Sequence, residues 1–422
     1  MSYPTGDRNI RMTKFKAMGV LLGGLALLGA GCGSGGSAEV YAIVDKDPVA
    51  AVNAYGYYDE VQQVGRVKTL VRPSDIHRSG QGVDGIPVLT APFFVTVDEA
   101  ETEGVLIDEF YGISVKDGET RKFYPLQILA WHEIVHDTMD GAPIIVTYSP
   151  LTEATGVYRA DGAFGVSGYV WNNESLMYDE ATKTLWSRLI GRGAYGSQAG
   201  RDLSTIPFEL VPWEKWREAY PEGRVLSTQT GYARRYDRSP YGGYLLSRNI
   251  FFPMSQPFVA ALEPKAVVSG IVVEGIAKAY QAGPVAQHED GLKQEKMGET
   301  NIVVWVDEAR GVLRAHEAVD VDFRSVDGED LMDRARNRWT LDEDGNLIFG
   351  DRVLRTLVPQ TMFWFGWSSL HPDSHLYGNV RGKGLVDGLL EIEEGEGVDL
   401  NEDNEIKVDA SFGAEATETE AQ

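Results

Sequence analysis

Cysteine is almost absent from this sequence: Cys32 is the only one among 422 residues. A disulfide within the chain is therefore excluded, and so is a zinc or iron–sulfur site built from several thiolates. Any metal bound by this chain would need His, carboxylate or backbone oxygen ligands.

Basic residues are also scarce. Asp and Glu outnumber Lys and Arg by 63 to 39, which gives a formal net charge of −24. Such a chain repels phosphate backbones instead of displacing their counterions. We therefore predict that nucleic acid is not a partner.

The longest apolar run, residues 17–31, is too short for a membrane span. It has about 15 residues, whereas a bilayer-spanning helix needs roughly 20. Four basic residues stand in the preceding 8–16, and Cys32 follows directly. This order predicts a signal peptide over 1–31, followed by a tether and N-terminal segment over 32–83 that opens with a Gly/Ser-rich stretch.

The ending Gly29-Ala30-Gly31-Cys32 resembles the bacterial lipoprotein box, although Gly29 stands where Leu is usual. A lone Cys at the end of the apolar run favours lipidation of Cys32 over a buried free thiol. We expect an extracytoplasmic protein that is attached to the membrane through this lipid, with the membrane itself as a partner. Gly33 stands where Asp commonly retains such proteins at the inner membrane, so the outer membrane is favoured if the host has one.

An internal repeat organises the rest of the chain. Its composition is that of a globular protein, with 43% hydrophobic residues, and its length exceeds that of one core. We predict an α+β fold: a β-rich tandem duplication of two halves, 84–245 and 246–380, each with short strands and about two helices. The matched segments are Gly112–Val115 with Gly270–Val273, Lys122–Tyr124 with Lys278–Tyr280, Ile144–Val146 with Ile302–Val304, Gly156–Arg159 with Gly311–Arg314, and Trp213, Trp216 and Pro221 with Trp364, Trp367 and Pro372.

Local patterns predict the elements of the first half. Apolar spacing predicts a helix over 125–137, and a second short helix over 212–219. Short β-branched and aromatic runs predict strands over 144–148, 156–159, 165–170 and 176–178. Residues 381–422 are predicted to be an acidic disordered tail, because 391–422 hold twelve acidic residues and only Lys407 as a base.

One metal motif is present in full. His132-Glu133-Ile134-Val135-His136 fits H-E-x-x-H, which on a helix places two imidazoles on one face for zinc and lets the Glu activate water. The matching segment, however, keeps His288-Glu289 and has Leu292 in place of the second His. The alternatives are a zinc site with His132, His136 and a third ligand from Glu174 or Asp179, or a structural His132 inside the helix packing.

Other candidate site residues cluster after strands. Ser149, in Ser149-Pro150-Leu151-Thr152, is a possible nucleophile, but no Gly-x-Ser-x-Gly elbow surrounds it, so a turn hydroxyl is the stronger interpretation. The candidate catalytic residues are thus His132, Glu133 and Ser149. Candidate ligand-binding residues are an aromatic followed by two carboxamides, and a nearby tyrosine: Trp171, Asn172, Asn173 and Tyr178.

Several motifs in this order resemble one family. They are Trp131–Val135, Thr147–Leu151, Phe164–Gly168, Met177–Asp179, Leu185–Ser187, Gly231–Tyr236 and Pro240–Tyr244. The sequence resembles bacterial and archaeal secreted proteins of the domain of unknown function 3179 family over about 84–380. The resemblance implies a location outside the cytoplasm and no established reaction.

Two departures from that family matter. Its members typically carry Cys-Pro-Leu-Cys where this chain has Ser149–Thr152, and Asn-Asp where it has His136-Asp137. Any thiol-based metal or redox chemistry implied by the resemblance is lost here, because hydroxyls are harder ligands and cannot form a disulfide. The second departure makes the H-E-x-x-H match a product of one substitution.

We therefore predict a lipid-anchored extracytoplasmic protein that binds a small molecule or a protein partner, is non-catalytic or catalytically degenerate, and needs no cofactor. The alternative is a metal-dependent hydrolase with zinc held by the His132-Glu133-x-x-His136 motif.

Overall fold

The computed structural model describes residues 43–160, 162–288, 290–342 and 344–378, all within one unit of the chain, 39–422. The predicted signal peptide, Cys32 and the predicted acidic tail lie outside the described residues.

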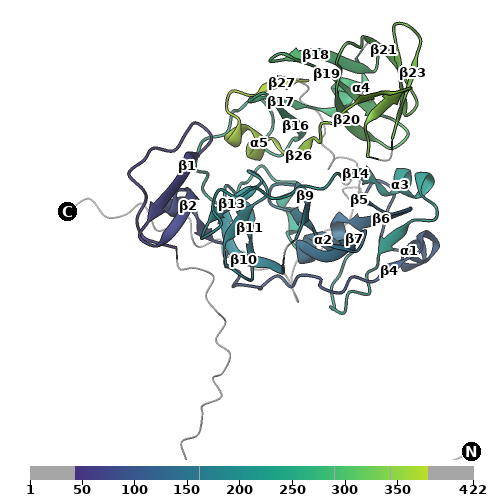
Figure 1. Cartoon of the computed structure of the whole chain (residues 1–422). Helices are drawn as coiled ribbons and strands as arrows, with labels where there is room; N and C mark the ends of the chain where they lie inside the picture. Colours follow the sequence, from purple (N-terminus) through teal and green to yellow (C-terminus); the bar gives the residue numbers. More distant parts are fainter. Residues whose placement is uncertain (1–42, 161, 289, 343, 379–422) are drawn as a thin grey trace, which may run out of the picture. The chain divides into compact units, whose positions relative to one another are not determined.

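Strands dominate the described residues, and helices are few and short (Figure 1). The prediction of a β-rich fold is confirmed. The α-helices in the described ranges are α1 (Val97–Glu103), α2 (Leu126–His132), α3 (Trp213–Ala219), α4 (Ala282–Ala286) and α5 (Trp364–Leu370), with 3-10 turns η1 (Pro73–Asp75) and η2 (Gly242–Tyr244).

Within the described residues, strands β1 to β15 form three sheets. The largest has the order β1-β2-β13-β12-β11-β10-β3, with β1 (Tyr57–Val64), β2 (Val67–Val71), β13 (Arg192–Tyr195), β12 (Leu185–Ser187), β11 (Glu174–Asp179), β10 (Phe164–Trp171) and β3 (His77–Arg78). The next has the order β14-β5-β6-β15-β4, with β14 (Glu209–Pro212), β5 (Tyr111–Asp117), β6 (Thr120–Pro125), β15 (Arg224–Leu226) and β4 (Phe94–Val95). The third joins β7 (Ile134–Met139), β8 (Ala142–Ser149) and β9 (Ala154–Arg159).

In the part of the chain that the structure describes, strands β16 to β27 form three further sheets. One has the order β26-β16-β17-β27, with β26 (Gln360–Phe363), β16 (Val267–Val273), β17 (Ile276–Tyr280) and β27 (His375–Tyr377). Another joins β18 (Leu292–Met297), β19 (Thr300–Asp307) and β20 (Val312–Glu317). The last joins β21 (Phe323–Asp327), β22 (Asp330–Asp333), β23 (Arg338–Leu341), β24 (Leu347–Phe349) and β25 (Arg352–Leu354).

The predicted strands and the helix over 212–219 correspond to β8, β9, β10, β11 and α3. The predicted helix over 125–137 is wrong at its C-terminal end. Helix α2 ends at His132, Glu133 adopts a φ of 56°, and residues 134–139 form β7 against β8. The β-branched pair Ile134 and Val135 gains cross-strand partners in β8, which outweighs its helical spacing.

Helix number and segment bounds also differ from expectation. The described part of 84–245 has three α-helices, because α1 begins at an unrecognised capping box in which Thr96 and Glu99 hold each other's backbone N–H. Residues 57–78, expected as part of an N-terminal segment, supply β1, β2 and β3 to the sheet that contains β10 and β13.

The core is built on large aromatic side chains. Trp216 in α3 and Trp367 in α5 are both fully buried. Trp216 donates its indole N–H to Ser114 Oγ at 2.9 Å, and Trp367 donates to Ser374 Oγ at 2.8 Å. Each of these two helices is therefore fixed by a buried indole that donates to a serine hydroxyl.

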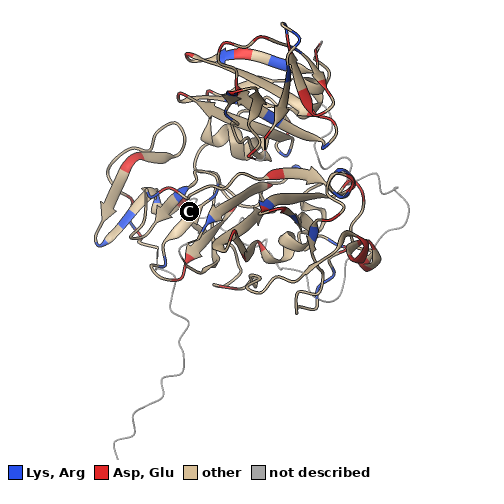
Figure 2. Ribbon diagram, turned by 45° about the vertical axis from the view of Figure 1, so that its right-hand side comes forward, with Lys and Arg blue, Asp and Glu red and all other residues tan. Residues whose placement is uncertain are grey.

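Charged residues are spread along both halves. Figure 2 shows acidic and basic positions interspersed over the ribbon, with acids gathered on α1.

Candidate functional site

A buried polar centre in the first half contains Glu133. This residue caps the C-terminus of α2 with φ 56° and ψ −30°, a conformation that costs a non-glycine residue energy. Its N–H donates to Leu129 O and its C=O accepts from Tyr148 N, so the backbone is fixed on both sides. The side chain that results is 1% exposed.

The centre also contains a second acid and an arginine. Glu174, at the start of β11, accepts from the backbone N–H groups of Arg188 and Leu189 and from the Ser187 hydroxyl. Arg188 Nη1 lies 3.6 Å from Glu174 Oε1, and Arg188 Nη2 lies 3.9 Å from Glu133 Oε2. All three side chains are at most 1% exposed.

Several polar atoms of this centre lack partners. Among the described residues, Glu133 Oε2 and the Nε and Nη2 atoms of Arg188 have no hydrogen bond. Arg188 Nη1 alone is satisfied, by Ser175 O at 2.6 Å. Such atoms are costly when buried, and a polar group placed between them would satisfy them.

Burial changes the protonation of both acids. It raises the pKa of Glu174 to about 7, against the opposing effect of Arg188 and of the three donors. Burial likewise raises the pKa of Glu133, against Arg188, Ser175 and Tyr241. One guanidinium thus faces two carboxyls whose pKa values are both raised by burial, Glu174 with three hydrogen-bond donors and Glu133 with the Tyr241 hydroxyl.

The turn between β8 and β9 borders the centre. Ser149 is fully buried, and its Oγ accepts from Ser175 N at 3.4 Å. Thr152 Oγ1 is another buried atom without a partner in the described chain, while Thr152 O accepts from Phe363 N at 2.9 Å. The candidate nucleophile Ser149 therefore ends β8 with its side chain enclosed in the interior.

A long irregular stretch, which we call the covering segment (residues 227–266), encloses the centre. Its only regular element is η2. Tyr241 OH donates to Glu133 Oε1 at 2.9 Å, and Tyr244 OH donates to Leu151 O at 2.7 Å. Two tyrosines of this segment thus contact the polar centre and the adjacent β8–β9 turn.

Asn172 and Asn173 hold the covering segment in place. Both have positive φ and form the two-residue β10–β11 turn, a conformation that Asn tolerates. Asn173 donates to Phe252 O at 2.7 Å and accepts from Phe252 N at 2.8 Å, and Asn172 Oδ1 accepts from Ser255 N at 2.7 Å. The two amides therefore serve both the turn and the position of the covering segment.

The other two candidate ligand-binding residues are also enclosed. Trp171 is fully buried, and its Nε1 has no partner within the described ranges. Tyr178 is 3% exposed and donates to Asp84 Oδ2 at 2.8 Å. A role of these four residues in ligand binding stays a prediction.

The two histidines of the H-E-x-x-H pattern do not share a helix face. His132 Nδ1 lies 2.7 Å from Pro87 O, and Nε2 lies 2.7 Å from Tyr236 OH. Burial lowers the pKa of His132 to about 4, so its ring is neutral, donating to Pro87 and accepting from Tyr236. His136 lies on β7, and its Nε2 contacts Phe164 O at 2.7 Å.

The expected geometry of the metal motif is therefore not formed, because the helix ends between its two histidines. Of the suggested third ligands, Glu174 faces Arg188, and Asp179 accepts from Trp186 Nε1 at 2.9 Å. In the described ranges no group of three or more His, Cys, Asp or Glu side chains is placed to hold a metal ion.

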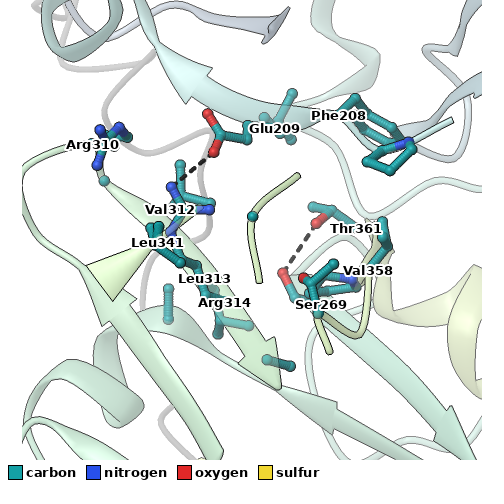
Figure 3. A pocket seen from close by; sticks show the side chains of 18 of the residues that line it. Phe208, Glu209, Ser269, Arg310, Val312, Leu313, Arg314, Leu341, Val358 and Thr361 are labelled. Carbon is teal, nitrogen blue, oxygen red and sulfur yellow. Dashed lines mark hydrogen bonds and ion pairs between the residues drawn. The ribbon is translucent and has the colours of Figure 1, made fainter. Parts of the chain in front are cut away.

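A cavity of about 790 Å³ lies between the two halves (Figure 3). Its walls come from the edge strands β14, β20 and β26 and from β16. Glu209 on β14 and Arg314 on β20 form one wall through a 2.8 Å ion pair, and Ser269 and Thr361 form another through a 3.0 Å hydrogen bond (Figure 3).

Ion pairs hold the charged side chains on one wall of this cavity. Burial alone would raise the pKa of Glu209, but Arg314, Arg121 and Arg310 bring it below its usual value, so the carboxylate is ionised. Arg314 also contacts Asp307 Oδ2 at 2.9 Å. Glu209 Oε2 has no hydrogen-bond partner in the part of the chain that the structure describes.

Sequence reasoning missed several of these residues. Arg188 was not identified, although an arginine directly after the apolar strand Leu185–Ser187 is an available signal. Tyr241 appeared only within a family motif. Glu209 and Arg314 come together from different halves, which no local pattern indicates.

Comparison with known proteins identifies the family. A family model described as "Protein of unknown function (DUF3179)" matches residues 83–374. The chain belongs to the DUF3179 family. The match begins next to Asp84, which accepts from Tyr178, and it spans the buried centre, the covering segment and the cavity of this DUF3179 member.

Neither a curated protein nor a solved structure matches this DUF3179 chain. No helix within its described residues is long and apolar enough to cross a membrane.

Proposed function

We propose that this DUF3179 protein is a lipid-anchored extracytoplasmic binding protein whose ligand occupies the cavity between its two halves. The observation that carries this proposal is the cavity itself. Its volume of about 790 Å³ lies within the range of roughly 300–1,000 Å³ that small-molecule sites span, and such sites favour junctions between structural units.

The chemistry of the walls indicates a polar ligand. Glu209 offers an ionised carboxylate with one unpaired oxygen in the described chain, and Arg314 and Arg310 contribute positive charge nearby. Phe208 adds an aromatic surface at the end of the cavity away from Arg310 (Figure 3). A molecule of metabolite size that carries both donors and acceptors fits this mixture best.

Binding is favoured over catalysis because the candidate catalytic groups are held in structural hydrogen bonds. His132 is neutral, with both nitrogens engaged, and Ser149 is enclosed beneath the turn. A degenerate catalytic site is consistent with these roles.

The proposal includes a tandem duplication, supported by two sheets of identical order. In β14-β5-β6-β15 and β26-β16-β17-β27 the first two pairings are antiparallel and the last is parallel. The registers agree as well: Pro212 pairs with Tyr111 as Phe363 pairs with Val267, and Val225 pairs with Phe123 as Leu376 pairs with Ala279.

A matched polar triad supports the same proposal. In the first half, Asp137 Oδ2 accepts from Lys122 Nζ at 3.0 Å and from Tyr124 OH at 2.6 Å. In the second half, Glu295 accepts from Lys278 Nζ at 2.5 Å and from Tyr280 OH at 2.7 Å. The strand registers of the two sheets place Gly270 at the position of Ser114. The repeat expected from sequence instead aligned Gly270 with Gly112, two residues earlier.

The contacts between the halves are reciprocal. Strand β14 contacts β20, and its counterpart β26 contacts β9, the counterpart of β20. Reciprocal contacts of this kind are typical of a two-fold arrangement of related units. The cavity therefore lies at a junction that a duplicated dimer-like architecture would create.

The anchoring part of the proposal depends on Cys32, which lies outside the described residues. Its support is the basic stretch 8–16, the apolar run 17–31 and the single cysteine that follows. A lipid at Cys32 would hold the binding unit at the membrane despite its net negative charge.

Native mass spectrometry of the protein purified from its host envelope tests the ligand. We expect a bound small molecule in wild type and its loss in Thr361→Trp, because the indole fills the cavity beside Ser269. Thr340→Trp, on an exposed strand position, is the matched control and should retain the molecule. An empty wild-type protein, or a molecule retained in Thr361→Trp, would contradict the proposal.

A further inference from the structure

The guanidinium of Arg188 presents one complete edge without hydrogen bonds. Its Nη1 donates to Ser175 O, whereas Nε and Nη2, which form the adjacent edge, make no hydrogen bond in the described ranges, and Nη2 lies 3.9 Å from Glu133 Oε2. The side chain is 1% exposed, so water outside the protein does not satisfy this edge. Two parallel N–H groups in this arrangement match the two oxygens of a carboxylate.

We propose that the buried polar centre binds a small carboxylate on the Nε–Nη2 edge of Arg188. This site is separate from the cavity between the halves, because Glu133, Glu174 and Arg188 are not among the residues that line the cavity.

Glu133 completes the site. Its Oε2 faces Arg188 Nη2 across 3.9 Å, a gap wider than a direct hydrogen bond. Its Oε1 accepts from Tyr241 OH, which leaves Oε2 as the position for a proton. Burial favours the protonated form of this carboxyl, and a protonated Oε2 donates to the bound carboxylate.

The charges around the site are consistent with an anion. Arg188 is the cation that acts on both acids of the centre. It pairs with Glu174 through Nη1, which lies on the side of the guanidinium away from the Nε–Nη2 edge. Tyr148, Tyr241 and Ser175 are the other groups that face Glu133. Since these are neutral donors, the ligand carboxylate meets three hydrogen-bond donors and no second ionised acid when Glu133 is protonated.

The covering segment provides the route by which the ligand would reach the Arg188 edge. It crosses the centre through Tyr241 and Tyr244 without strand pairing over 227–266, and it exposes Leu246 and Phe251. Long segments of this kind commonly act as movable covers of binding sites. Because the free edge is enclosed, the ligand must be small, with a short side group beyond its carboxylate.

Titration calorimetry with sodium acetate tests the site, with acetamide and sodium chloride as controls at matched ionic strength. We expect saturable binding of acetate alone. Arg188→Lys, which keeps the charge and loses the fork, should weaken acetate binding by about 10- to 100-fold. Arg338→Lys, at an exposed pair with Asp330, is the matched control and should bind as wild type does.

Several outcomes overturn the proposal: no saturable acetate binding, equal binding of acetamide, or unchanged binding in Arg188→Lys. If Arg188→Lys does not fold, a crystal structure of the wild type grown in sodium formate decides. Two formate oxygens on Nε and Nη2 support the proposal, and ordered water alone contradicts it. The cavity variant Thr361→Trp should still bind acetate, which separates this result from the fate of the cavity ligand.

Discussion

Three glutamates with raised pKa values distinguish the interior of the first half. Burial raises the pKa of Glu174 and of Glu153 to about 7, and that of Glu133 in the same direction. Glu153 accepts a hydrogen bond from Tyr148 OH at 2.9 Å, which only partly offsets its burial. Each of these residues therefore couples folding to proton uptake.

The sign of that coupling can be stated for Glu153. Its pKa rises from 4.5 to about 7 on folding, so the folded protein holds a proton there that the unfolded chain has lost. The stability from this group is fully present below about pH 4.5 and is lost as the pH rises through 7.

Glu153→Gln should therefore stabilise the protein at alkaline pH. The amide keeps the Oε1 acceptor for Tyr148 and carries no charge, so at pH 8 we expect a gain of about 1–3 kcal/mol in the free energy of unfolding. At pH 4, below the unfolded pKa, the variant and wild type should be equal. Urea denaturation at both pH values measures this, and a variant no more stable at pH 8 would disprove the raised pKa.

Among the elements, the covering segment is anchored in part by the β10–β11 turn. The amide of Asn173 makes two hydrogen bonds to Phe252, and the positive φ of Asn173 is one that Gly also adopts. Removing this amide should loosen the segment without straining the turn.

Asn173→Gly should accordingly raise hydrogen exchange in residues 246–258 and leave the protection of β8 unchanged. Asp320→Gly, at an exposed position with φ 53°, controls for the added glycine and should not alter exchange there. Equal exchange in Asn173→Gly and wild type would show that other contacts hold the segment.

The helices α3 and α5 carry matched tryptophans that should matter equally. Trp216→Ala and Trp367→Ala each remove a fully buried side chain, and we expect losses of roughly 3–5 kcal/mol in unfolding free energy. Trp216→Phe and Trp367→Phe, which keep most of the volume, should lose less. Thermal and denaturant unfolding measure all four, and a loss below about 1 kcal/mol at either Ala variant would contradict the equivalent roles.

Local patterns predicted the elements where apolar runs and turn residues agree, as in β8, β10 and α3. They failed at α2, because Glu133 takes a positive φ and the next residues pair with β8. The residues of the centre were partly found: Glu133, Glu174 and Ser149 were named, but their roles were not. Arg188 and Tyr241 reach them from 14 and 108 residues away, a proximity that only the sheet order creates.

For the whole molecule, sequence predicted two related halves but not how they meet. The reciprocal contacts of β14 with β20 and of β26 with β9 depend on tertiary packing, and so does the ion pair of Glu209 with Arg314. No periodicity within one half contains this information.

The proposed lipid anchoring concerns the whole molecule, and one substitution tests it. Cys32→Ser should release the protein from the membrane into the soluble extracytoplasmic fraction, because the attachment atom is lost. Fractionation of cells that express each form measures this, with Ser34→Ala as the control. Unchanged membrane association of Cys32→Ser would contradict the lipoprotein prediction.

The central claim is that the junction between the halves holds a polar small molecule, and a high-resolution crystal structure of the protein purified from its native envelope tests it most directly. We predict continuous density for a non-water molecule between β14, β20 and β26, within hydrogen-bond distance of Glu209 or Arg314. A cavity filled by ordered water alone, in protein that was never stripped of ligand, would contradict the account.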